Sequence, residues 1–156
     1  MRRFLFLAIS ILLLVSCNDY RKIEVSNVSI NSVKIKSTTK ATLEVKAEVK
    51  NPTKKSISLL NAEGMLLKEN KDFILFSLAD TVTLAPGADM TIIIPVDGKV
   101  VDPIGILSSG LDIKSWNKDN FSVEGAFTVK MGKCPKQRVK INNTPVRTIL
   151  DYLRKR

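Results

Sequence analysis

The fold is decided by the stretch Ala41-Thr42-Leu43-Glu44-Val45-Lys46-Ala47-Glu48-Val49-Lys50-Asn51-Pro52. Its apolar side chains alternate with polar ones, so an extended chain would place them on opposite faces. One buried and one solvated face are typical of strands in antiparallel sheets. Asn51-Pro52 ends the strand, because proline lacks the N–H that the ladder of hydrogen bonds requires. The stretch therefore predicts an antiparallel β protein.

The segment before this strand also alternates, but its apolar phase shifts between the pairs Ile23/Val25, Val28/Ile30 and Val33/Ile35. A shift by one residue turns the apolar side chains to the other face of a strand. We therefore expect bulges, or a turn, at Asn27 and at Asn31-Ser32.

Further strands are expected downstream at residues 57–67, 73–78, 82–84, 90–96, 121–130 and 136–141. Residues 90–96 are almost continuously apolar, which predicts a central strand covered on both faces. Asp102-Pro103 provides a cap and first turn for a short helix at 104–109, which Gly110 closes. Seven or eight strands with one or two short helices indicate an all-β fold, an antiparallel β-sandwich of about seven strands resembling a fibronectin type III domain.

The N-terminus resembles a secretory leader. Arg2 and Arg3 precede an apolar run at 4–15 that is too short to span a bilayer. The run closes with Leu14-Val15-Ser16-Cys17, which resembles the bacterial lipobox, where cleavage leaves a diacylglycerol-modified and then palmitate-bearing cysteine as the first residue. A buried apolar helix that happens to contain a cysteine is the alternative.

These features divide the chain into a lipoprotein signal peptide at 1–16, a lipidated tether at 17–22, a β-sandwich at 23–143 and a C-terminal helix at 144–156. Thr144-Pro145 reads as the cap of that helix, whose residues 146, 149, 150 and 153 are apolar. The expected location is the bacterial cell envelope. Asn18, rather than an acid, follows Cys17 and favours the outer membrane over the inner one.

Lipidation of Cys17 leaves Cys134 as a single thiol and excludes an intrachain disulfide. Cys134 could pair with another chain, and Lys133 and Lys136 beside it could lower its pKa and make it reactive, but a buried or inert thiol is the simpler interpretation.

The net charge of the mature chain lies near its C-terminus. Residues 17–129 hold 14 basic and 14 acidic side chains, whereas residues 130–156 hold nine basic ones and a single acid. A concentrated excess of positive charge attracts anions. Anionic lipid head groups or an acidic envelope polymer are therefore expected partners of Lys133, Lys136, Arg138, Lys140, Arg147, Arg154, Lys155 and Arg156. Alternatively, the helix only packs against the domain and its charges remain solvated.

Catalytic signals are weak. The chain has no histidine, which excludes Ser-His-Asp and Cys-His nucleophile systems. Asp97, Asp102 and Asp112 do not form a calcium-binding run, and the isolated glycines form no phosphate-binding loop. We expect no catalytic residue, no metal and no cofactor. Nucleic acid is not an expected partner, because no aromatic residues interleave the basic ones.

The order of motifs resembles the late embryogenesis abundant type 2 family with its WHy domain. The matching segments are Val49-Lys50-Asn51-Pro52-Thr53, Ile57-Ser58-Leu59, Thr91-Ile92-Ile93-Ile94-Pro95-Val96 and Phe121-Ser122-Val123-Glu124-Gly125, within residues 30–141. The resemblance implies a seven-stranded antiparallel sandwich with an added helix, and a non-catalytic role in stress protection or binding. The basic C-terminal helix is not part of that pattern.

Three hypotheses follow from the sequence: a protective or scaffolding module, a module that binds an anionic envelope partner, and an enzyme that uses carboxylates. We favour a membrane-anchored, non-enzymatic lipoprotein of the first kind.

Overall fold

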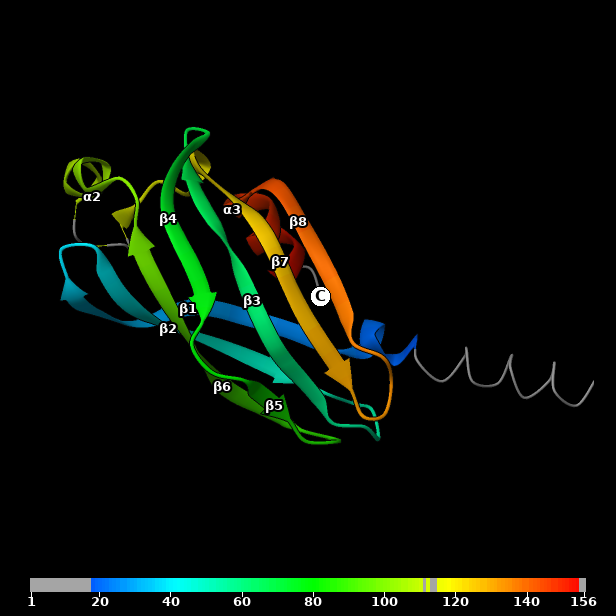
Figure 1. Ribbon diagram of the computed structural model, residues 1–156. Helices are drawn as coiled ribbons and strands as arrows, with labels where there is room; N and C mark the ends of the chain where they lie inside the picture. Colours follow the sequence, from blue (N-terminus) through cyan, green and yellow to red (C-terminus); the bar gives the residue numbers. More distant parts are fainter. Residues whose placement is uncertain (1–17, 111, 113–114, 155–156) are drawn as a thin grey trace, which may run out of the picture.

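Within the residues that the structure describes, the chain forms eight strands and two short α-helices, arranged as Figure 1 shows. The computed structural model describes residues 18–110, 112 and 115–154. The elements in chain order are η1 (Asn18–Lys22), β1 (Glu24–Ser37), β2 (Lys40–Lys50), β3 (Ile57–Lys68), β4 (Lys71–Leu78), β5 (Val82–Leu84), β6 (Asp89–Val100), α2 (Pro103–Ser109), η3 (Lys118–Asn120), β7 (Phe121–Met131), β8 (Gln137–Pro145) and α3 (Val146–Arg154).

The strands form one antiparallel sheet in the order β1-β2-β6-β4-β3-β7-β8, and β5 pairs with β3. β2 and β6 stay in register over their whole length, from Lys40 opposite Lys99 to Lys50 opposite Asp89. The two halves of the sheet face one another across a core that joins β2 with β3, β5 and β7. Its buried members are Ala47, Val49, Ile57, Leu84 and Met131.

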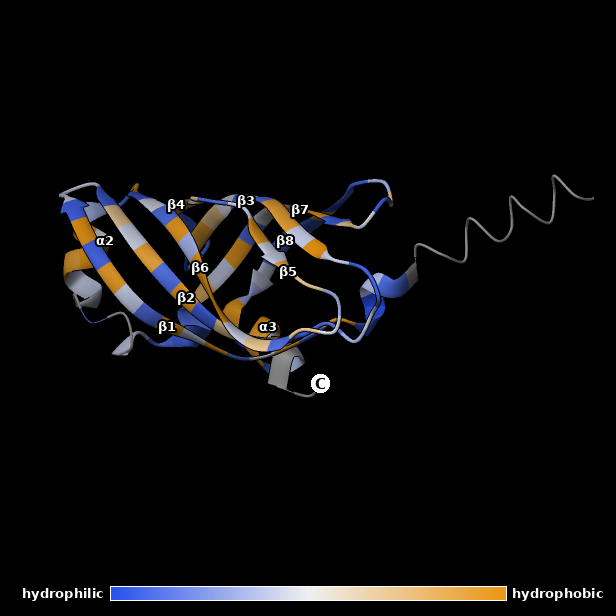
Figure 2. Ribbon diagram, turned by 90° about the horizontal axis from the view of Figure 1, so that it is seen from below, coloured by the Kyte–Doolittle hydropathy of each residue, from blue (hydrophilic) through white to orange (hydrophobic). Residues whose placement is uncertain are grey.

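A second apolar group lies toward the opposite end of the sheet, where three aromatic rings meet. Phe73 of β4 contacts Trp116 edge-on at a centroid distance of 5.3 Å. Trp116 also stacks on Phe121, the first residue of β7, at 5.2 Å. Figure 2 shows hydrophobic and hydrophilic residues alternating along several strands, as expected where successive side chains point to opposite faces of a sheet.

The predicted all-β class and all the predicted strands are confirmed. β1 carries register shifts between Ser26 and Ser29 and between Ile30 and Ser32, which are the expected bulges. Asn27 adopts a positive φ of 49°, a conformation that asparagine tolerates better than most residues. The β-rich class therefore follows from local patterns in the sequence.

One strand departs from the expectation. Residues 90–96 were predicted to be covered on both faces, yet Met90 and Ile93 are about half exposed, at 51% and 52%. β6 lies inside the sheet between β2 and β4. Ile92 packs against the core, while its neighbour Ile93 faces outward. Because almost every residue of the run is apolar, its sequence did not indicate that one face of the strand is exposed to solvent.

The predicted short helix is confirmed as α2. The Asp102 side chain accepts a hydrogen bond from the backbone N–H of Gly105 at 2.9 Å, and Gly110 follows as the C-cap. The C-terminal helix begins later than expected, because Pro145 is the last residue of β8 and pairs with Ser122. β8 is an edge strand, where proline is tolerated because its missing N–H requires no partner.

The Asn-Pro pair after β2 is a structural junction. Asn51 is fully buried, and its side-chain amide donates to the carbonyl oxygens of Lys55 and Ala85, each at 2.9 Å. Its Oδ1 accepts from the hydroxyl and backbone N–H of Thr53, at 2.7 and 3.2 Å. One side chain thereby ties together the loops that precede β3 and follow β5.

Candidate functional site

The segment predicted as a tether is folded onto the domain. Residues 18–22 form the short helix η1, and the Tyr20 side chain reaches the turn between β7 and β8. The Tyr20 hydroxyl accepts a hydrogen bond from the Met131 N–H at 3.0 Å and donates one to the Pro135 carbonyl at 3.2 Å. An extended tether would have lost these contacts. The first described residue is therefore held at one end of the sheet.

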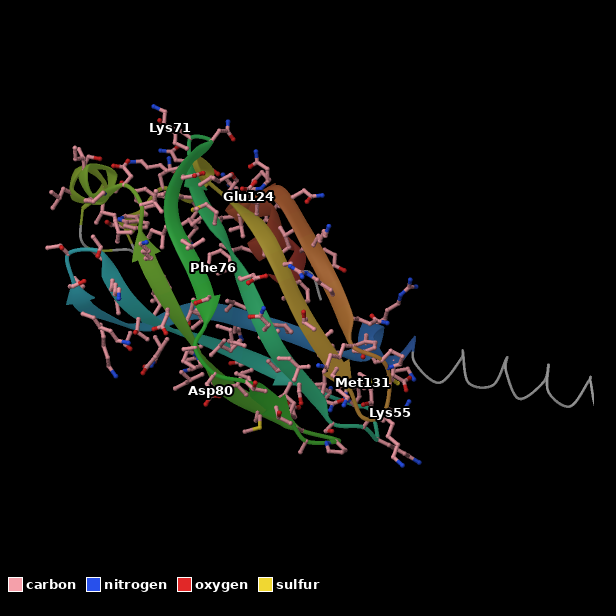
Figure 3. All side chains as sticks on the ribbon, in the orientation of Figure 1. Lys55, Lys71, Phe76, Asp80, Glu124 and Met131 are labelled. Carbon is pink, nitrogen blue, oxygen red and sulfur yellow. The ribbon has the colours of Figure 1, made fainter. Side chains whose placement is uncertain are left out.

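Cations surround this end, which we call the basic end. It consists of η1, the loop between β2 and β3, and the turn between β7 and β8. These three segments carry one acid, Asp19, and six basic residues: Arg21, Lys22, Lys54, Lys55, Lys133 and Lys136. Figure 3 shows Lys55 and Met131 at this end, whereas Lys71 lies at the opposite end of the molecule.

Asp19 does not cancel this charge. Lys22 lies 2.8 Å from one carboxylate oxygen of Asp19, and Lys55 lies 3.5 Å from the other. The hydrogen bond from Lys22, together with the charges of Lys22 and Lys55, holds the pKa of Asp19 below its ordinary value of 3.8. The carboxylate stays ionised and orders the two lysines, while Arg21, Lys54, Lys133 and Lys136 remain exposed.

The basic residues predicted from the C-terminal sequence do not share one surface. Lys133 and Lys136 belong to the basic end. Arg138 on β8 pairs with Glu63 at 3.1 Å. Arg147 on α3 donates to both carboxylate oxygens of Asp119, at 2.8 and 2.9 Å, and this contact raises its pKa.

Lys140 is exposed on β8, which runs from the basic end to α3. Arg154 ends α3, and Lys155 and Arg156 lie outside the described residues, as does Cys17, the predicted lipidation site. Basic residues that are close together in the sequence are therefore spread in the structure from the turn between β7 and β8, along β8, to α3. The excess of charge in residues 130–156 did not indicate four other members of the basic end: Arg21, Lys22, Lys54 and Lys55. These lie far from the C-terminus in sequence, and strand pairing and the Tyr20 hydrogen bonds bring them to this end.

Cys134 is buried at 6% exposure, as the simpler interpretation expected. Its backbone N–H donates to the Met131 carbonyl at 2.9 Å, within the turn of the basic end. Within residues 18–110, 112 and 115–154, no three His, Cys, Asp or Glu side chains are grouped so as to hold a metal ion. No helix in this same part of the chain has the length and apolar character needed to cross a membrane.

An apolar cavity of about 320 Å³ lies at the other end of the molecule. It is open to solvent on one side and is lined by the hairpin of β1 and β2, by β4 and β6, by α2 and by Trp116. Figure 1 shows α2 far from η1. Side chains at its edge leave apolar surface in solvent, because Ile35 is 68% exposed and Leu107 is 72% exposed. No pattern in the sequence predicted this cavity, because its walls come from five separate segments.

Comparison with known proteins defines the fold alone. No family profile matches the chain, and no curated protein does either. A solved structure, the crystal structure of a protein from Archaeoglobus fulgidus, is similar with a TM-score of 0.50 and 12% sequence identity. The similarity covers 78% of this chain and 97% of that chain.

Proposed function

We propose that this protein is a non-catalytic lipoprotein of the bacterial cell envelope, anchored through acyl chains on Cys17. Its β-domain would act as a stress-protective or scaffolding module, in keeping with the resemblance to the late embryogenesis abundant type 2 family. The similar structure from Archaeoglobus fulgidus shares the overall fold and bears on neither this resemblance nor the role. The outer membrane is the proposed location, because Asn18 follows Cys17.

The observation that carries this proposal is the basic end. η1 starts directly after Cys17 and is held to the β7–β8 turn by Tyr20. Acyl chains on Cys17 would therefore bring six cations to the membrane surface. Each Lys or Arg near an anionic bilayer contributes about 1 kcal/mol of attraction. The anchor and the charge thus act on the same surface, which favours anionic head groups as the partner of the basic residues.

The pKa values of three carboxylates support a non-catalytic role. The lowered pKa values of Asp19, Glu44 and Asp97 arise from hydrogen bonds and from nearby lysines. General acids and bases are instead tuned toward the working pH. These three carboxylates therefore act as ion-pairing groups within the fold.

The anchor is tested by labelling cells that express the full chain with a clickable palmitate analogue. Wild-type protein should incorporate the label and sediment with membranes, and Cys17→Ala should lose both. Cys134→Ala is the matched control, because it removes the other thiol and should leave labelling unchanged. Equal labelling of wild type and Cys17→Ala would exclude the proposed anchor.

The membrane-facing role of the basic end is tested by hydrogen exchange on lipidated protein in vesicles. Amides in the loop 53–56 and the turn 132–136 should exchange more slowly on vesicles with phosphatidylglycerol than on pure phosphatidylcholine. The variant Lys133→Glu/Lys136→Glu should abolish that difference. The control Lys71→Glu/Lys118→Glu changes the same charge elsewhere on the surface and should retain it. Identical protection on both lipids would contradict the role.

A further inference from the structure

The apolar cavity has the walls of a binding site for hydrocarbon. Val33 and Leu43 line it from the β1–β2 hairpin, Ile74 and Val100 from β4 and β6, and Ile106 from α2. Its volume of about 320 Å³ falls at the lower end of the range of roughly 300 to 1,000 Å³ for ligand sites. A site of this size holds a single chain or a small molecule rather than a protein segment with its side chains.

The chemistry of the lining selects against a peptide. A peptide would bring backbone N–H and C=O groups into a space walled by aliphatic side chains. Such groups cost free energy when they are buried without hydrogen-bond partners. The indole N–H of Trp116 already donates to the Gly110 carbonyl at 2.8 Å. The other lining side chains that can form hydrogen bonds belong to the hairpin end, beside the exposed Ile35: Ser37, Thr38 and Lys40. A ligand with an apolar body and one polar end fits this distribution.

The charge at this end selects the sign of the polar group. Lys40 is the single charged residue among the described side chains that line the cavity. Lys99 lies directly opposite Lys40 in the β2–β6 register, so two like charges face each other across neighbouring strands. Asp97 and Glu63 line a second, more polar cavity together with both lysines, so carboxylates already lie near this pair, and the charge that the apolar cavity offers to a ligand is that of Lys40. Neither lysine forms an ion pair within the described residues.

We propose that this cavity binds a single-chain anionic amphiphile, with its hydrocarbon chain under α2 and its head group beside Lys40. Two sources share this chemistry: a free fatty acid, whose head is a carboxylate, and a lysophospholipid, whose head contains a phosphate. The site goes beyond membrane anchoring, since it lies at the opposite end of the molecule from the basic end and does not depend on the anchor.

Trp116 provides the reporter for a direct test. It is the sole tryptophan of the chain and lines the cavity. The full chain is purified with the modifications that the cell adds and is placed in phosphatidylcholine vesicles. It is then titrated with a brominated fatty acid or a brominated lysophosphatidylglycerol, because bromine quenches tryptophan emission. We expect saturable quenching of Trp116 by one or both probes, and which probe binds more tightly identifies the source. A brominated alkyl trimethylammonium should bind more weakly.

Two substitutions on α2 form a matched pair. Leu107 lines the cavity and Ile104 does not, yet both are highly exposed, at 72% and 78%, so neither change should disturb folding. Leu107→Glu should weaken quenching about tenfold, because a carboxylate beside the hydrocarbon must be desolvated. Ile104→Glu should retain wild-type quenching.

Lys40→Glu tests the head group separately. It should weaken binding of the anionic probes about threefold, as expected for a partly solvated ion pair, and should strengthen binding of the cationic probe. Quenching that does not saturate, or that is the same in Leu107→Glu and Ile104→Glu, would overturn the proposal. The proposal would also be overturned if light scattering showed a dimer and the probe bound only after that dimer dissociated.

Discussion

Asn51 shows how a single buried polar residue can define a fold. Its side chain satisfies two carbonyl oxygens and accepts two hydrogen bonds from Thr53, so every polar atom of the amide has a partner. The sequence located this residue only as the end of a strand, and as part of a motif shared with a family. Its bond to Ala85, 34 positions away, could not be predicted, because it depends on how β5 pairs with β3.

Replacing Asn51 by alanine should be strongly destabilising. Asn51→Ala leaves the backbone N–H of the buried Thr53 without its acceptor and removes one donor each from the carbonyls of Lys55 and Ala85. An unsatisfied buried group costs about 1 to 3 kcal/mol. We expect the free energy of unfolding to fall by about 2 to 4 kcal/mol in urea denaturation followed by circular dichroism. Asn61→Ala, at an exposed position of β3, should change stability by less than about 0.5 kcal/mol. Similar losses in both variants would refute the junction role.

At the scale of elements, the β1–β2 hairpin depends on polar bonds across its solvated face. Glu44 accepts hydrogen bonds from the Ser32 hydroxyl at 2.7 Å and from the Asn31 amide at 3.1 Å, and it pairs with Lys34 at 3.4 Å. The alternation of residues 41–49 predicted this face, and the phase shifts predicted the bulges. Which residue of β1 meets Glu44 could not be predicted, because each bulge moves the register by one position.

The hairpin should respond to acid through Glu44. The hydrogen bond from Ser32, followed by those from Asn31 and Lys34, lowers the pKa of Glu44 below its ordinary value of 4.5. The unfolded chain therefore takes up the proton first, so this stabilisation is present above pH 4.5 and is lost as the pH falls through the lower folded pKa.

Urea midpoints measured at a series of pH values should therefore fall less steeply below pH 4.5 in Glu44→Gln than in wild type. Glutamine keeps the shape of the side chain and does not titrate. Parallel pH profiles of the two proteins would show that Glu44 does not contribute to acid sensitivity.

The whole molecule is polarised along its length. One end carries η1 and six cations, and the other carries α2, the aromatic cluster and the apolar cavity. The excess charge lies in residues 130–156 of the sequence, whereas the fold places Lys133 and Lys136 at one end of the molecule and Arg147 far from them. Neither end could be predicted from neighbouring residues, because each is assembled from segments brought together by long-range strand pairing.

The basic end should be sensitive to salt. The Debye length falls from about 10 Å at 0.1 M to about 3 Å at 1 M ionic strength, so exposed cations lose their attraction to anionic lipid. Slow exchange of the 132–136 amides on phosphatidylglycerol vesicles should therefore be lost between these two concentrations, while the lipidated protein stays bound. Protection that persists at 1 M salt would indicate a contact that does not depend on charge.

The junction at Asn51-Pro52 also bears on the lifetime of the protein. Asparagine commonly deamidates when the backbone N–H of the next residue attacks its side-chain carbonyl, and proline has no such N–H. Aspartate at position 51 would point a carboxylate at the carbonyl oxygens of Lys55 and Ala85 in a buried site. Deamidation of Asn51 would thus damage the fold, and Pro52 blocks the route by which it commonly occurs.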